Sequence, residues 1–316
     1  MADLFVAGGS GYIGGAFVRR AVAAGWRVRA LARSDASRAL LHAAGAEPVT
    51  GDLLEPGPWQ EVAAGAAVVV HLAQPETYGA RVGVARARRW RDNRLRMDAH
   101  LLDPLRPGVV RRVVYVCGTS YYGAMGAEPR DEDAPPQPRG WGPYVAPAVD
   151  ALRDHVARGV PIVEAYPGWV YGPGSWYAEY ILAPLRRGWT LNVLAGPDHI
   201  VVPVHVEDAS RAILHLCDHG EAGRRYFVVD DRPGPGSRIL ELAAHALGVP
   251  YRVRRIPLWL YKLALGPILT ESQTYDCNLT NARLRATGFA FDFPTVEQGV
   301  PDAVQRWLAA RARRAS

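Results

Sequence analysis

A glycine loop set directly behind an apolar strand constrains this chain more than any other feature. Residues 4–7 are apolar and typical of a buried strand, and residues 8–14 read GGSGYIG before a helical run begins. Glycine permits a tight turn and a close approach of backbone N–H groups to a pyrophosphate, and the N-terminus of the helix adds partial positive charge. Between a first strand and a first helix, this loop predicts dinucleotide binding. The residues predicted to hold the dinucleotide here are Gly8, Gly11, Tyr12, Ile13 and Gly14.

The rest of the first half alternates strand patterns with helical patterns, which is typical of a parallel sheet covered on both faces. Strands are expected at residues 4–7, 28–31, 47–49, 67–72, 113–117 and 161–165, and helices opening near residues 11, 34, 58, 84 and 144. We therefore predict an α/β fold with a doubly wound, parallel Rossmann-type sheet in residues 1–168. Residues 169–316 are expected to form a smaller C-terminal α/β substrate lobe of helices and short strands, such as one at residues 226–229, with a segment near 196–219 returning to the first domain. The stretch 126–142, rich in Pro, Gly and acidic residues, is expected to be a surface loop.

Charge and cysteine content bear on the classes of partner. The formal charge of +6 and the pI near 9.4 would suit a nucleic acid, but nearly all the positive charge is arginine, which indicates a compositional bias. We expect no nucleic-acid partner, and an exposed helical face for the arginines of residues 86–96. The three cysteines are widely separated and lack metal-ligand spacing, which argues against disulfides and a metal site. The chain has no leader pattern and no apolar run of about 18 residues, so a cytoplasmic protein without a membrane partner is expected.

The end of the second strand bears on the choice of dinucleotide. An NAD site usually places an acid there, roughly 20 residues beyond the glycines, to bind the ribose 2′-hydroxyl. Here an uncharged residue, Ala32, is followed by Arg33. Because a guanidinium binds phosphate in a bidentate manner, the sequence favours NADP(H) over NAD(H), with Arg33 on the 2′-phosphate and Arg38 as an assistant; surface exposure of either arginine is the alternative.

Several further segments resemble the extended short-chain dehydrogenase/reductase family, the NAD(P)-dependent epimerase/dehydratase group. They are residues 51–53 (GDL), 71–73 (HLA), 114–117 (VYVC) leading to 122–123 (YG), 167–174 and 204–208. The resemblance covers nearly the whole chain and implies a small-molecule substrate and pairing of two copies through the helices at 84–105 and 144–156. It further implies adenine contacts from Asp52 and Leu53, cofactor packing on Ala73, and nicotinamide contacts near Pro167 and Gly168.

The catalytic positions of this family depart from its pattern in this chain. The family uses a Tyr-x-x-x-Lys pair with a Ser or Thr, and the tyrosine matches Tyr144, but the lysine position holds Ala148. The Ser/Thr position falls on Gly118, with Thr119 and Ser120 directly after it. A free tyrosine has a pKa near 10 and a nearby cation favours its phenolate, so the missing lysine handicaps alcohol oxidation. Reduction of a ketone needs a protonated acid instead, which an ordinary tyrosine provides. The candidate catalytic residues are Tyr144, Thr119 and Ser120.

Three functions remain open at this stage. The first is an NADP(H)-dependent reductase or epimerase-type enzyme, the second a redox-silent enzyme of the same fold that catalyses elimination, isomerisation or cyclisation, and the third a non-catalytic nucleotide sensor. The second lobe favours an enzyme, because it has aromatic residues available to line a pocket: Trp169, Trp176, Tyr177 and Trp259. Other acid/base candidates are Asp131, Glu132, Asp133, Tyr177, Glu179, His199 and His205.

Overall fold

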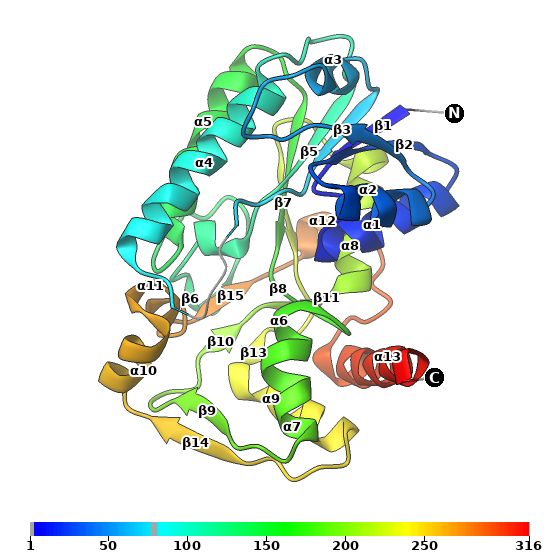
Figure 1. Ribbon diagram of the computed structural model, residues 1–316. Helices are drawn as coiled ribbons and strands as arrows, with labels where there is room; N and C mark the ends of the chain where they lie inside the picture. Colours follow the sequence, from blue (N-terminus) through cyan, green and yellow to red (C-terminus); the bar gives the residue numbers. More distant parts are fainter. Residues whose placement is uncertain (1–2, 77–80, 316) are drawn as a thin grey trace.

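A seven-stranded parallel sheet forms the frame of the protein in the computed structural model, which describes residues 3–76 and 81–315 (Figure 1). The strand order is β12-β7-β5-β4-β1-β2-β3, so the chain reverses direction across the sheet between β1 and β4. Open α/β sheets bind ligands at that switch point, beyond the carboxyl ends of the strands. All six strands predicted in the first half are confirmed, and the strand predicted at residues 226–229 exists but joins this sheet as β12 and not the second lobe. The strands are β1 (Asp3–Ala7), β2 (Arg27–Ala32), β3 (Glu47–Thr50), β4 (Val68–His71), β5 (Arg112–Val116), β7 (Ile162–Pro167) and β12 (Arg225–Val228).

Helices cover both faces of this sheet, as a doubly wound fold requires (Figure 1). Alternate residues of β1 face opposite layers: Leu4 and Val6 join one buried cluster, Phe5 and Ala7 the other. The first layer holds α1 (Tyr12–Ala23), α2 (Asp35–Ala43) and α8 (Val206–His219), and the second holds α3 (Trp59–Ala64), α4 (Val84–Leu102) and α5 (Gly142–Ala157).

The smaller C-terminal lobe combines short helices with two-stranded pairings. Its own core is a third apolar cluster, in which the long last helix packs on α9. The pairs β8–β11, β9–β14 and β6–β15 are parallel, and β10–β13 is antiparallel. The strands are β8 (Trp169–Tyr171), β9 (Leu191–Leu194), β10 (Ile200–Val201), β11 (Pro203–His205), β13 (Gly234–Pro235), β14 (Val253–Ile256) and β15 (Cys277–Leu279). The helices are α6 (Ser175–Tyr177), η2 (Ala178–Leu182), α7 (Ala183–Arg186), α9 (Gly236–Ala246), α10 (Leu258–Leu265), α11 (Pro267–Glu271), α12 (Ala282–Ala286) and α13 (Val296–Ala315).

Two segments cross the boundary between the halves. Residues 196–219 contain β10, β11 and α8, and α8 lies against α1 in the first layer. Residues 225–228 form β12, which extends the main sheet beside β7. The stretch 126–142, predicted as a surface loop, also contains a strand, β6 (Gly126–Arg130), which is exposed throughout and pairs with β15. That pairing is remote in sequence, so the local pattern could not indicate it. Within the described residues, no helix is both long and apolar enough to span a bilayer.

Candidate functional site

The glycine loop lies at the switch point, directly against the end of β4. Gly8 has a φ of +87°, and a β-carbon there would lie 2.4 Å from the backbone nitrogen of Ala73. A β-carbon at Gly14 would lie 2.0 Å from the carbonyl oxygen of Gly8. Both positions therefore require glycine, because backbone atoms occupy the space that a side chain would need.

The start of α1 beside this loop is open. Gly11 is exposed and serves as the N-cap, and no side chain within residues 3–76 and 81–315 caps the N-terminal N–H groups of α1. Such a helix end binds an anion through its N–H groups and its dipole. The loop and helix therefore fit the pyrophosphate of a dinucleotide.

Tyr12 and Ile13 begin α1 in different roles. The hydroxyl of Tyr12 lies under the turn after β8, where a β-carbon at Gly172 would be 2.5 Å from it, and burial raises the pKa of Tyr12. Ile13 packs partly buried on the core between α1 and the sheet. Tyr12 thus links the cofactor loop to the second lobe.

The ends of β2 and β3 form the adenosine side of the predicted site. Arg33 is exposed and forms a hydrogen-bonded ion pair with Glu76, which follows β4. Arg38 lies nearby and donates to the Thr50 hydroxyl at 3.4 Å. The carboxylate of Asp52 accepts the Leu54 N–H at 2.9 Å, which fixes the turn after β3.

Leu53 is buried behind that turn, and its carbonyl lies 2.8 Å from Nδ1 of His100 on α4. Its backbone is therefore held in place by the second helical layer.

A buried polar cluster lies beneath the ends of β4 and β5. Arg94, on α4, is 2 % exposed and donates to the carbonyl of Ala73 at 2.7 Å. Its guanidinium is 2.9 Å from a carboxylate oxygen of Asp98, one helical turn further along. His71 and Tyr115 complete the cluster, with contacts of 2.8 and 2.7 Å to that carboxylate.

Electrostatics in this cluster keep its groups in fixed charge states. Burial would raise the pKa of Asp98, but the Arg94 guanidinium and the hydrogen bonds from His71 and Tyr115 hold it below its usual value. Burial, followed by the charge of Arg94, lowers the pKa of His71. Sequence reasoning placed Arg94 on an exposed arginine face, which is wrong. The signal that could have separated it from its neighbours is Asp98, four residues away on the same helix face.

The three predicted catalytic residues lie on neighbouring elements. Thr119 and Ser120 belong to the 3₁₀ turn η1 (Thr119–Tyr121) that follows β5, and Tyr144 lies in the first turn of α5. These two elements touch, because a β-carbon at Gly142 would lie 2.6 Å from the carbonyl oxygen of Ser120. Thr119 is buried and Ser120 half-buried.

The ring of Tyr144 is half-buried beside the second lobe. It packs near Trp141, with ring centroids 6.4 Å apart, and against the cluster that contains Val82 and Ile268. Its hydroxyl forms no hydrogen bond or ion pair with any residue in the described ranges. Ala148, one turn further, is 2 % exposed. Among the described residues the hydroxyl therefore has no partner, and the next turn of its helix carries no cation.

Pro167 and Gly168 end β7 at the junction of the two lobes. A β-carbon at Gly168 would lie 1.8 Å from the carbonyl oxygen of Val202, and the N–H of Trp169 donates to that same carbonyl at 2.8 Å. This close crossing fixes where the second lobe departs from the sheet.

Most of the other acid/base candidates serve structural contacts. Glu132 is buried and accepts the Phe227 N–H at 2.8 Å, Tyr177 is buried and donates to the carbonyl of Ile239, and His199 contacts Asp276.

Trp259 is 70 % exposed, so the prediction that it lines a pocket is wrong; it lies on an outward face of α10. In the part of the chain that the structure describes, no cluster of metal-ligating side chains is found.

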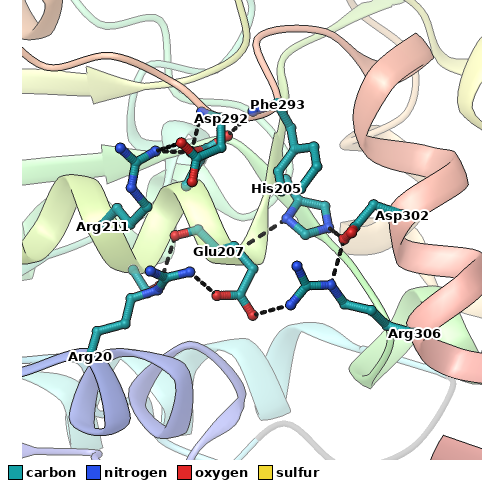
Figure 2. A network of polar contacts seen from close by, with 10 residues as sticks. Arg20, His205, Glu207, Arg211, Asp292, Phe293, Asp302 and Arg306 are labelled. Atoms are coloured by element: carbon teal, nitrogen blue, oxygen red, sulfur yellow. Dashed lines mark hydrogen bonds and ion pairs between the residues drawn. The ribbon is translucent and has the colours of Figure 1, made fainter. Parts of the chain in front are cut away.

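His205 belongs to a network that joins α1, α8 and α13 (Figure 2). Its Nδ1 accepts the N–H of Glu207 at 3.2 Å, which caps α8, and its Nε2 lies 3.3 Å from Asp302. Burial lowers the pKa of His205 to about 4. The carboxylate of Glu207 pairs with Arg20 on α1 and Arg306 on α13. This network ties the cofactor domain to the last helix and makes His205 a structural residue.

Comparisons with known proteins agree with this geometry. The NAD dependent epimerase/dehydratase family matches residues 4–229. A 4-hydroxy-2-methyl-3-oxo-4-farnesyl-3,4-dihydroquinoline-1-oxide ketoreductase of Stigmatella aurantiaca is 27 % identical over 80 % of this chain and 75 % of its own length. A 2-alkyl-3-oxoalkanoate reductase of Shewanella oneidensis is 25 % identical over 84 % of this chain and 71 % of its own. A ceramide reductase of Caulobacter vibrioides is 25 % identical over 80 % and 73 %.

Solved structures share the fold. The dTDP-glucose 4,6-dehydratase DesIV of Streptomyces venezuelae, solved with NAD and TYD, superposes with a TM-score of 0.82 at 22 % identity and covers 98 % of each chain. A human epimerase family protein solved with NADPH gives a TM-score of 0.79 at 20 % identity, over 96 % of this chain and 99 % of its own. These two structures contain different dinucleotides. The likeness therefore supports the fold, but it does not indicate whether this chain prefers NADP(H) or NAD(H).

Proposed function

Since the chain belongs to the NAD-dependent epimerase/dehydratase family, we propose that it is an NADP(H)-dependent reductase of a ketone on a small molecule with an apolar chain. The names of the three relatives support the direction and the substrate class. Each relative is named a reductase, and the names specify a farnesyl group, an alkyl group and ceramide.

The surroundings of Tyr144 carry the proposal. Its hydroxyl has no partner among the described residues, and the buried Ala148 leaves no cation on the adjacent turn to stabilise a phenolate. A protonated tyrosine donates a proton to a carbonyl oxygen as that oxygen gains negative charge. Tyr144 is therefore suited to act as the acid in a reduction and poorly suited to act as the base in an alcohol oxidation.

The chain's own residues provide binding and proton transfer. The loop at Gly8 to Gly14 and the open start of α1 would hold the pyrophosphate, and the bound NADP(H) would supply hydride to the carbonyl carbon. Tyr144 would give its proton to the carbonyl oxygen and regain one from water. Thr119 and Ser120, on the turn that touches the start of α5, would hold the same oxygen by hydrogen bonds.

The preference for NADP(H) rests on Arg33 and is moderated by Glu76. A 2′-phosphate at the end of β2 would accept hydrogen bonds from Arg33. The carboxylate of Glu76 forms an ion pair with the Arg33 guanidinium, so the 2′-phosphate must displace that carboxylate in order to bind Arg33. Arg33→Gln should weaken NADPH binding more than NADH binding. Glu76→Gln should raise the affinity for NADPH a few-fold and leave that for NADH unchanged, because the exposed ion pair that it removes is worth about 0.2 to 1 kcal/mol.

The deciding experiment measures turnover of alkyl-substituted 3-oxo compounds by the loss of NADPH absorbance. Tyr144→Phe should lower kcat by about 10² to 10⁴, which is the range for loss of a general acid, while the Kd for NADPH measured by calorimetry stays the same. Tyr226→Phe is the matched control, because that tyrosine lies on the edge strand β12 and its hydroxyl accepts the Glu221 N–H at 3.0 Å.

Each alternative has its own outcome. Product formed without consumption of NADPH would assign a redox-silent enzyme, and tight NADPH binding with no turnover of any carbonyl compound would assign a sensor. Full activity of Tyr144→Phe would overturn the assignment of the acid. Pairing through α4 and α5 and a cytoplasmic location stay predictions, and equilibrium sedimentation tests the pairing.

A further inference from the structure

The helix α10 presents large apolar side chains that the described residues of the chain leave exposed. Its sequence, LWLYKLAL, contains one charged residue, and none of its eight residues is fully buried. Trp259 is 70 % exposed and Leu263, one turn further on the same side, is 61 % exposed. Large apolar side chains gathered on one exposed face mark an interaction surface.

The position of α10 makes this face accessible. Figure 1 shows α10 at the outer corner of the smaller lobe, next to β14 and away from the main sheet. The Leu265 carbonyl accepts the Val82 N–H at 2.9 Å, and the Leu263 carbonyl accepts Nε of Arg81 at 3.1 Å, so the helix is held from one side. Both hydrogen bonds are accepted by main-chain carbonyls, and the side chains of Trp259 and Leu263 stay exposed.

Basic side chains lie close to α10 in the sequence, on or directly before β14 and within α10 itself. Residues 242–270 contain no Asp or Glu, and four exposed basic side chains fall within them. Within residues 3–76 and 81–315, none of the four forms an ion pair with a carboxylate. The four are Arg252, Arg254, Arg255 and Lys262.

This combination favours an anionic bilayer over a second copy of the chain. Two copies meeting face to face through α10 would bring their basic side chains together, and like charges at a contact oppose association. An anionic lipid surface attracts each basic residue and accepts tryptophan and leucine at the level of the headgroups. On such a surface, both the exposed apolar side chains of α10 and the basic residues near it favour binding.

We propose that α10 is a membrane-docking helix, which lies on an anionic phospholipid surface with Trp259 and Leu263 inserted at the boundary between headgroups and acyl chains. Binding through so short a helix is reversible and falls as salt rises, because the Debye length shortens. From the sequence we predicted no membrane partner, because no apolar run is long enough to span a bilayer. A helix that lies on the membrane surface does not need a spanning segment. The inference does not depend on the reaction proposed above.

The test is flotation of the full-length protein with vesicles of phosphatidylcholine alone and of phosphatidylcholine mixed with phosphatidylglycerol. The wild type should float with the anionic vesicles and stay behind with the neutral ones. Trp259→Ser with Leu263→Ser should reduce partitioning at least about tenfold, since both side chains lose apolar contact with the bilayer. Arg254→Gln with Lys262→Gln should reduce it about 25-fold on anionic vesicles, at roughly fivefold for each basic residue.

Trp189→Ser is the matched control. Trp189 is a similarly exposed tryptophan, 58 % accessible, outside α10, and its replacement should leave flotation unchanged. NADPH affinity and thermal unfolding of all variants should match the wild type, which shows that they are folded. Absence of flotation with anionic vesicles would overturn the proposal, as would equal flotation of the Trp259/Leu263 variant. A wild-type dimer in solution that the same variant converts to monomer would assign the face to a second copy instead.

Discussion

Replacement of Arg94 by methionine tests the role of the buried cluster beneath the cofactor loop. Arg94 and Asp98 are 2 % and 5 % exposed, and the variant leaves the Asp98 carboxylate without its cation. Breaking a buried ion pair by removing one partner costs about 3 to 5 kcal/mol. The carboxylate keeps its contacts with His71 at 2.8 Å and Tyr115 at 2.7 Å, which favours the lower end of that range. The carbonyl of Ala73 loses its 2.7 Å donor, which adds about 1 kcal/mol.

We therefore expect Arg94→Met to lower the free energy of unfolding by about 4 kcal/mol, measured by urea denaturation at neutral pH. Arg96→Met is the matched control, because Arg96 lies on the same helix but is exposed, and such surface changes stay within about 0.5 kcal/mol. The double variant Arg94→Met/Asp98→Asn removes the orphaned charge and keeps a hydrogen-bond acceptor for Tyr115. It should be about 2 kcal/mol more stable than Arg94→Met alone.

The reasoning would be refuted if Arg94→Met unfolded within about 1 kcal/mol of Arg96→Met, since no buried charge pair would then contribute. Additive effects of the Arg94 and Asp98 substitutions would refute the coupling between them. NADPH affinity should also fall in Arg94→Met and not in Arg96→Met, because Ala73 lies against Gly8 of the cofactor loop.

Two further predictions concern the glycine loop and His205. Gly14→Ala should abolish NADPH binding in calorimetry, since its methyl group would lie 2.0 Å from the Gly8 carbonyl oxygen. The matched change Gly15→Ala should bind NADPH normally and gain about 0.5 to 1 kcal/mol of stability, because its methyl group would make only ordinary contacts, at 3.5 Å to the Arg19 guanidinium and 3.9 Å to the Gly9 carbonyl oxygen. Because the pKa of His205 falls from about 6.5 in the unfolded chain to about 4 in the folded protein, its contribution is fully present above pH 6.5 and is lost as the pH falls toward 4. The wild type should lose about 2 kcal/mol more than His205→Asn between about pH 7.5 and pH 5, and equal losses in urea denaturation would contradict this.

The sequence was sufficient for the parts of the fold that local pattern determines. The six predicted strands and the glycine loop follow from apolar runs and turn residues within a few positions of one another, and all are in place. The strand predicted at residues 226–229 is β12, but its place in the main sheet beside β7 was not predicted, nor was the pairing of β6 with β15, because each partner lies far away in the chain. Periodicity indicates that a segment is extended but not which strand it joins.

The site residues that local sequence determines were predicted, and those that depend on distant segments were not. Gly8 and Gly14 were identified because backbone geometry demands glycine at specific offsets. Arg94 was misjudged because its burial depends on His71 and Tyr115, which come from two different strands. The pairing of Arg33 with Glu76 was not foreseen, since Glu76 has no spacing relation to the end of β2.

The apolar helix α10 is connected through α11 to the candidate acid on α5. Gly266, with a φ of +83°, joins α10 to α11, and a β-carbon there would lie 2.3 Å from the carbonyl oxygen of Val82. Ile268 and Leu269 of α11 then pack in the cluster that holds the ring of Tyr144. A bilayer bound at Trp259 would therefore lie on the helix that precedes the one packed on the tyrosine. An apolar chain could then stay in lipid while its carbonyl reached Tyr144, so the substrate need not expose that chain to water, a transfer that costs about 0.8 kcal/mol for each CH₂.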